Sequence, residues 1–148
     1  MISRKINLDR FYQKCKQHSL KITPQRTAVY KTLEASSSHP CADMIHKVLQ
    51  KEFPNISLDT VNRTLITFSK VNIIDVVEGR GDPRRFDPNL DAHHHFHCLA
   101  CNKIFDFHDT ALDQITPSSD IAKKFIITGK KIVLKGYCDN CRSQASTL

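Results

Sequence analysis

Two C-x-x-C motifs constrain this chain most: Cys98–Cys101 and Cys138–Cys141, separated by residues 102–137. Each motif can bend around one cation, and together they offer four thiolates, the donor set of a tetrahedral structural zinc site with no open position. The competing interpretation is a thioredoxin-like redox pair, but that motif stands at a helix start after a strand and does not occur twice. We therefore predict structural Zn2+ at Cys98, Cys101, Cys138 and Cys141, and metal-dependent folding of the C-terminal part.

The chain's length and hydropathy favour a small intracellular protein. Its 148 residues suggest one or two small domains, and no apolar run approaches the ~18 residues of a membrane span. Residues 1–10 are charged and lack the apolar core of a signal peptide. We therefore predict a cytoplasmic protein with no membrane partner, in which cysteines remain reduced. Cys15 lies on an apolar stripe and is predicted to be a core residue, whereas a role for Cys41, close to His39, stays open.

Basic residues concentrate in the first part of the chain. The whole sequence has 22 Lys and Arg against 15 Asp and Glu. Residues 1–88 hold 15 basic and 9 acidic side chains, and residues 89–148 hold 7 and 6. An uneven positive charge of this kind is found in domains that bind polyanions, although a soluble domain can also be basic by chance.

Helical periodicity followed by a hairpin pattern organises this basic part. Thr23 and Pro24 form a helix start, and Ser57 is expected to cap a later helix that ends near Asn72. The expected elements are helices over 7–19, from 24 onward, over 42–52 and from 57 or 58, then strands over 73–77 and 84–86. This order is typical of a winged helix-turn-helix whose fourth helix enters the major groove.

The pattern changes after D-P-N-L-D (87–91), which we interpret as a hinge. Strand-like segments follow at 95–99, 104–107 and 125–134, with a helix over about 109–124 that Pro117 bends or splits. The predicted fold class is α+β, with a winged-helix DNA-binding domain over 1–86, a hinge over 87–92 and a small α/β dimerisation and metal-binding domain over 93–148. The last of these is too small to bury a large core alone, so it needs a metal, a partner chain or both.

Residues 93–97 read H-H-H-F-H. In an extended strand, His93, His95 and His97 point to one face, so neighbours two residues apart can share a cation. A solvent-exposed histidine cluster is the alternative. Further donors are available from His39, Asp87 and Asp106, and a set of imidazoles and carboxylates suits Fe2+ or Mn2+ and tolerates Zn2+. If His39 belongs to the DNA-binding part and His93 and His95 to the other, one cation ties the two parts together.

These motifs together resemble the Fur (ferric uptake regulator) family of dimeric metalloregulators. The matching segments are I-T-P-Q-R (22–26), H-P-x-A-D (39–43), F-P-N-I-S-L-D-T-V (53–61), R-F-D (85–87), H-x-H-x-x-C-x-x-C (93–101) and C-x-x-C (138–141). The resemblance implies a homodimer that binds a palindromic operator in double-stranded DNA and represses transcription when metal is bound.

Within the family, the sequence is most similar to the peroxide-sensing branch. The regulatory Fe2+ or Mn2+ ligands of that branch fall on His39, Asp87, His93, His95 and Asp106, whereas the iron-uptake branch usually has Glu at the two Asp positions. The resemblance implies that peroxide reacts at the iron-loaded site, that a ligand imidazole (His39 or His93) is oxidised, and that the operator is released. The manganese form is expected to ignore peroxide. Because this is self-oxidation without turnover, we expect the protein not to be an enzyme.

The resemblance and the charge pattern also suggest which residues contact DNA. We predict phosphate contacts or base reading by Lys21, Arg26, Ser57, Thr60, Asn62, Arg63, Arg80, Arg84 and Arg85. The family's usual recognition sequence A-T-V-Y-R is D-T-V-N-R here (59–63), so Asn62 replaces the usual Tyr and is able to pair with adenine. Family members with an additional metal site have His at Lys130 and an acid at His94, so we predict no fully formed additional site.

Three other functions remain open at the level of sequence. The chain could be an iron- or other metal-uptake regulator of the same family, which senses metal availability. It could be a zinc-dependent metalloenzyme whose histidines activate water, but it has no HExxH helix and no Gly-rich phosphate loop. It could also be a metal store or metal chaperone, which would bind several metals loosely and would show no operator preference.

Overall fold

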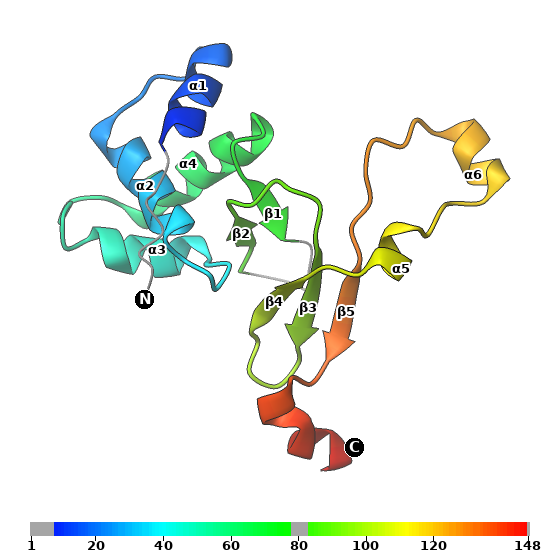
Figure 1. Cartoon of the computed structure of the whole chain (residues 1–148). Helices are drawn as coiled ribbons and strands as arrows, with labels where there is room; N and C mark the ends of the chain where they lie inside the picture. Colours follow the sequence, from blue (N-terminus) through cyan, green and yellow to red (C-terminus); the bar gives the residue numbers. More distant parts are fainter. Residues whose placement is uncertain (1–7, 78–82, 148) are drawn as a thin grey trace. The chain divides into compact units, whose positions relative to one another are not determined.

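The structure is a computed structural model that describes residues 8–77 and 83–147. Backbone contacts divide the chain into two compact units, residues 1–90 (unit 1) and 91–148 (unit 2). In Figure 1, the colours of unit 1 run from blue to green and those of unit 2 from yellow-green to red. No helix in these described ranges is long and apolar enough to cross a membrane.

Unit 1 consists of four helices followed by a two-stranded hairpin. Its elements are α1 (Asp9–Gln17), α2 (Pro24–Glu34), α3 (Ala42–Leu49), α4 (Leu58–Lys70), β1 (Asp75–Val77) and β2 (Arg85–Asp87). The two strands are antiparallel, with Val76 opposite Phe86. Helices α2 to α4 and the hairpin form the predicted winged helix-turn-helix (Figure 1).

The helix boundaries of unit 1 follow from local chemistry in the sequence. Thr23 is the N-cap of α2, and its hydroxyl accepts a hydrogen bond from the backbone N–H of Arg26 at 3.2 Å. Ser57 caps α4 in the same way, accepting from the N–H of Thr60 at 3.0 Å. Beyond the end of α4, Asn72 has a φ of 56°, the left-handed conformation that Asn tolerates. The predicted caps and this helix end are therefore confirmed.

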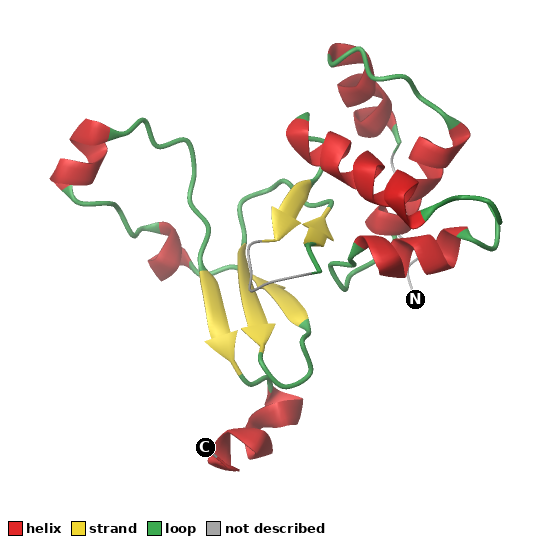
Figure 2. Cartoon of the chain, turned by 180° about the vertical axis from the view of Figure 1, so that it is seen from behind, coloured by secondary structure: helices red, strands yellow, loops and turns green. Residues whose placement is uncertain are grey.

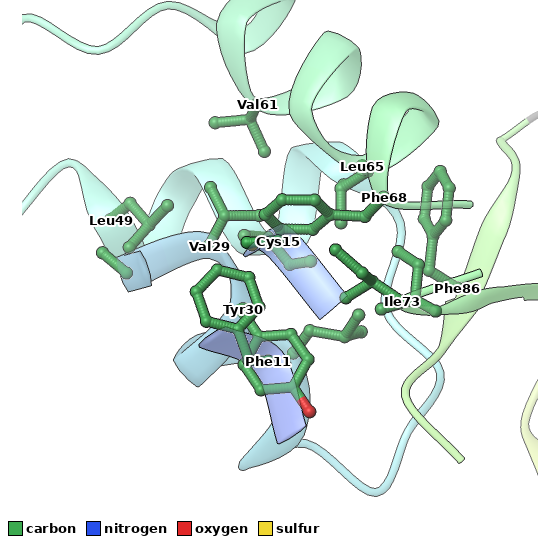
Figure 3. Packing of buried hydrophobic residues seen from close by; sticks show 14 of the residues in the cluster. Phe11, Cys15, Val29, Tyr30, Leu49, Val61, Leu65, Phe68, Ile73 and Phe86 are labelled. Carbon is green, nitrogen blue, oxygen red and sulfur yellow. The ribbon is translucent and has the colours of Figure 1, made fainter. Parts of the chain in front are cut away.

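Aromatic side chains form the centre of the unit 1 core. The rings of Phe11 and Tyr30 stack with centroids 4.5 Å apart, and Phe68 meets both rings edge-on (Figure 3). Cys15, on the α1 stripe, is fully buried in the same cluster, as predicted for a core residue. Phe86 on β2 also joins this core, so the hairpin packs against the helices and the wing has a fixed base.

Unit 2 is built on a three-stranded sheet. The strands β3 (His94–Cys98), β4 (Ile104–Phe107) and β5 (Val133–Gly136) lie in the order β4-β3-β5, and Figure 2 shows β3 between its two neighbours. β3 is antiparallel to β4 and parallel to β5. The register places His95 directly opposite Asp106, which brings an imidazole beside a carboxylate. Together with unit 1, this sheet gives the predicted α+β class.

The segment between β4 and β5 differs in part from the prediction. The expected single helix is split, as Pro117 suggested, into α5 (Thr110–Asp113) and α6 (Ser119–Lys124). The predicted strand over 125–134 is wrong except at its end, because residues 125–131 are exposed and only Val133 onward pairs with β3. Ile126, for example, is 96% exposed. A 3₁₀ helix over Asp139–Thr147, which the sequence did not predict, follows β5.

Candidate metal centres and nucleic-acid interface

The four cysteines of the two C-x-x-C motifs meet in unit 2. Their sulfur atoms all lie within 4.8 Å of one another, and the Cys101 and Cys138 Sγ atoms are 3.9 Å apart. Two structural devices bring them together: the tight turn after β3, where Asn102 has a φ of 61°, and the turn after β5, where the N–H of Cys141 donates to the carbonyl of Cys138. Four thiols in one cluster, three of them buried, fit a closed structural zinc site.

Backbone groups prepare one thiol of this cluster for metal binding. Backbone N–H donors, first of Cys101 and then of Cys138, lower the pKa of Cys98 to about 6. The Cys138 N–H lies 3.4 Å from the Cys98 sulfur. Because the thiolate is the form that ligates zinc, these donors favour the ligand state of Cys98 at neutral pH.

A second group of donors converges at the start of β3. The Nε2 atoms of His93 and His95 are 3.0 Å apart, and a carboxylate oxygen of Asp106 lies 3.2 Å from His95 Nε2 and 3.7 Å from His93 Nε2. Both histidines are buried. The Nδ1–H of His93 donates a hydrogen bond to the carbonyl of Asp91 at 2.5 Å. Nε2 of His93 therefore keeps its lone pair, which faces the His95 imidazole and the Asp106 carboxylate. The three groups are arranged as ligands of one hard cation.

Unit 1 contains an imidazole–carboxylate pair of its own. His39 Nε2 lies 3.4 Å from an Asp87 carboxylate oxygen, and both side chains are buried. His39 stands in the loop before α3 with a φ of 51°, and β2 fixes this loop. The guanidinium of Arg85 donates to the carbonyls of His39 and Ser38, and the N–H of Phe86 donates to the carbonyl of Pro40. Sequence reasoning missed this role of Arg85, because the contact joins residues far apart in the chain.

The other two histidines of the H-H-H-F-H run have protein partners. His94 donates from Nε2 to Asp113 at 2.6 Å, and its Nδ1 accepts from the N–H of Ile132. His97 donates from Nε2 to the side-chain carbonyl of Asn102 at 2.6 Å. Near the His94 pair, the ammonium of Lys130 donates to the main-chain carbonyls of Asp113 and Ile115. These contacts connect β3 and α5 to the segment before β5.

The predicted DNA-contacting residues of unit 1 fall on α4, near the start of α2, and on the hairpin. On α4, Arg63 is exposed, Thr60 and Asn62 are half-buried, and the Ser57 hydroxyl lies 2.8 Å from that of Thr60. Lys21 and Arg84 are exposed and Arg26 is half-buried, while the carbonyl of Lys21 accepts from the Arg26 guanidinium at 2.6 Å. Arg80 lies outside the described residues. These roles in DNA binding remain predictions.

A winged helix-turn-helix joined to a sheet that carries a four-cysteine cluster and convergent imidazoles defines a class of metal-binding DNA-binding proteins. Residues 17–135 match the model of the ferric uptake regulator family, and the chain belongs to this family.

Similar proteins agree with this assignment. The peroxide-responsive repressor PerR of Staphylococcus epidermidis is 35% identical over 127 residues, which is 86% of this chain and 85% of that protein. PerR of Staphylococcus aureus is 33% identical over 129 residues, 87% of each chain. Among solved structures, the Helicobacter pylori ferric uptake regulator Fur has a TM-score of 0.74 at 27% identity over 91% of both chains. The Campylobacter jejuni peroxide stress regulator has a TM-score of 0.66 at 28% identity, over 88% of this chain and 98% of that one.

Proposed function

We propose that the chain is a metal-dependent transcriptional repressor that binds operator DNA as a homodimer and senses peroxide by oxidation of a ligand histidine. The observation that carries the proposal is the convergence of His93, His95 and Asp106 in unit 2. Three donors leave a hard cation such as Fe2+ or Mn2+ incompletely coordinated, since such ions take about six ligands. His39 and Asp87 in unit 1 form a second donor pair of the same chemistry.

The five residues together make up the proposed regulatory ligand set, as the sequence resemblance implied. Because its members belong to both units, occupancy of the site would restrict how the DNA-binding unit is oriented. The four cysteines would hold zinc constitutively, since their closed thiolate set has no position for a reactant. The peroxide-responsive repressors among the similar proteins support the peroxide-sensing part of the proposal.

Ferrous iron held by these residues would supply the chemistry that activates peroxide, so that one peroxide oxygen is transferred to a ligand imidazole and the other leaves as water. The chain contributes the target, since an imidazole of His39 or His93 lies among the donors and takes up one oxygen atom. The oxidised ring is a poorer ligand, so the regulatory site loses metal and the operator is released. Each event consumes a residue of the chain, so the proposal assigns no catalytic turnover. Family regulators are transcription factors, which agrees with this.

Unit 2 carries the surface that supports the homodimer. Within the described residues, large exposed apolar side chains concentrate between α5 and the end of β5, at Ile115, Ile121, Phe125, Ile126, Ile127 and Leu134. Figure 1 shows that the α5–α6 excursion extends away from the three-stranded sheet. Apolar groups gathered in this way mark an association surface. The proposal also locates the protein in the cytoplasm, where thiols stay reduced.

The test combines DNA binding with mass spectrometry. We expect the zinc-loaded chain with added Mn2+ to retard a duplex selected from a random pool, and to release it when Mn2+ is chelated. The Fe2+ form exposed to peroxide should gain the mass of one oxygen atom on a peptide that contains His39 or His93, whereas the Mn2+ form should not. Release by chelation without any oxygen gain would instead identify a sensor of metal availability.

Two substitutions test the ligand assignment. Asp106→Ala should abolish metal-dependent retardation but keep the zinc content and the dimer, because Asp106 lies opposite His95 and away from the thiol cluster. Asp120→Ala, which removes an exposed acid from α6 of the same unit, is the matched control and should behave as the wild type. Retardation that still requires metal in Asp106→Ala would contradict the assignment.

A further inference from the structure

The solvent-facing side of α4 carries an ion pair within its first two turns. The Asp59 carboxylate lies 2.8 Å from Nε of Arg63, one helical turn later, and both side chains are largely exposed. The hydrogen bond from the Thr60 N–H to the Ser57 hydroxyl holds the backbone on which Asp59 stands. The pair therefore has a defined geometry on the helix that is proposed to enter the major groove.

The Asp59 carboxylate contacts one particular nitrogen of the Arg63 guanidinium. Asp59 contacts Nε, and no other described side chain or carbonyl contacts the Arg63 guanidinium. The two terminal nitrogens of Arg63 consequently remain available as a planar fork. A fork of this kind matches O6 and N7 of guanine in the major groove, the commonest specific contact between arginine and a base.

Stability is a weak explanation for the pair. An exposed ion pair four residues apart on a helix stabilises the fold only slightly, because water and salt screen both charges. A carboxylate close to DNA also repels phosphates, which lowers affinity for every sequence. Holding the Arg63 side chain in place raises the affinity for a matching base. Its rotatable bonds are fixed in advance, so less entropy is lost when it binds.

We propose that Asp59 is a positioning residue that holds the Arg63 fork ready to read a guanine in the operator. Asp59 thereby lowers affinity for DNA in general and raises the preference for the correct sequence. This inference rests on the proposed function, since it requires that the chain binds operator DNA through α4. It explains why a carboxylate is present at the start of a helix that faces a polyanion.

The chain provides its own matched control on another helix. Asp43 and Lys47 of α3 form an exposed ion pair with the same spacing, at 2.7 Å, and Asp43 also lies in the first turn of its helix. Asp43→Ala therefore makes the same change in net charge and removes the same type of pair as Asp59→Ala. Asp59→Asn retains a side-chain oxygen that can accept from Nε while it removes the charge.

The experiment measures Mn2+-dependent binding to two duplexes, one selected by the wild-type chain from a random pool and one with scrambled sequence, over a series of salt concentrations. We expect Asp59→Ala to tighten binding to the scrambled duplex and to lower the ratio of selected to scrambled affinity by about 3- to 10-fold. Asp43→Ala should keep the ratio at the wild-type value, and Asp59→Asn should restore most of it. Arg63→Ala should lower the ratio by about 5- to 150-fold, because a bidentate base contact is lost.

Several outcomes would overturn the inference. If Asp59→Ala raises affinity for both duplexes equally, the carboxylate only repels DNA. If it raises the ratio, the carboxylate masks Arg63. If Arg63→Ala leaves the ratio unchanged, Arg63 contacts a phosphate and reads no base. These results differ from a failure of the proposed function, in which the wild-type chain would select no sequence from the pool with Mn2+ present.

Discussion

Loss of one zinc ligand should unfold unit 2 and leave unit 1 intact. The apolar cluster of unit 2 consists of Cys98, Cys138 and Cys141 with the partly buried Phe96 and Tyr137 around them, so the zinc ligands are themselves most of the core. A structural zinc contributes about 10–16 kcal/mol of apparent binding free energy. A small domain has only about 5–15 kcal/mol of net stability. Cys138→Ser should therefore remove the whole free energy of unfolding of unit 2.

Unit 1 should survive because its core is independent of the thiol cluster. Among its described residues, fifteen form a buried cluster that is centred on the aromatic rings of α1, α2 and α4 (Figure 3). We expect limited proteolysis of Cys138→Ser to degrade residues 91–148 rapidly and to leave a helical fragment of unit 1. Zinc content, measured with a chromogenic chelator, should fall from one ion per chain to nearly none.

Cys15→Ala provides the control for this experiment, because it removes a buried thiol from unit 1. It should lower the stability of unit 1 by about 1–2 kcal/mol and leave the zinc content unchanged. The reasoning is refuted if Cys138→Ser has lost its zinc and residues 91–148 nevertheless resist the protease as they do in the wild type. That result would mean that unit 2 has an apolar core sufficient without metal.

Two further perturbations test other parts of the structure. Burial, followed by the Glu34 carboxylate, raises the pKa of Tyr30 from 10.0 to about 12. As the pH rises, Tyr30 therefore ionises in the unfolded chain before it does in the folded one. The free energy of unfolding of unit 1 should consequently fall between pH 10 and 12, by up to about 2–3 kcal/mol. Tyr30→Phe should weaken this dependence in urea titrations at several pH values, and an equal slope in both proteins would contradict the burial argument. Arg85→Ala should weaken Mn2+ binding by about 10- to 100-fold, because Arg85 holds the His39 loop. Competition with a fluorescent chelator measures this, with unchanged zinc content as the control, and an unaltered Mn2+ affinity would remove Arg85 from the supporting groups.

The sequence predicted those features that depend on neighbouring residues. Thr23 and Ser57 cap their helices through bonds to the N–H three residues later, so a short motif contains all the necessary information. The alternation of side chains in an extended segment is also a local property, and it correctly predicted that His93 and His95 lie on one face. The spacing of the C-x-x-C motifs likewise predicted one cluster, since four thiols without disulfides favour a common metal.

Features that depend on distant segments were missed. The apolar residues at 125–127 have the composition of a strand, but whether they pair depends on a neighbouring strand, and in the structure β3 already has β4 and β5 at its two edges. The contact between Arg85 and the His39 loop joins residues 46 positions apart, and no local pattern signals it. The Asp59–Arg63 spacing was visible in the sequence, but the free fork of the guanidinium was not.

Each of the three residues in the last strand of the wing makes a different contact. Arg85 anchors the histidine loop through its carbonyls, Phe86 enters the helical core, and Asp87 faces the imidazole of His39. The wing base and one member of this donor pair, Asp87, thus lie on the same short strand. A shift of β2 by one residue would exchange the inward and outward side chains and disrupt the anchoring, the packing and the proposed metal ligation at once. The R-F-D tripeptide of residues 85–87 would therefore have to be transplanted whole or left untouched in protein engineering.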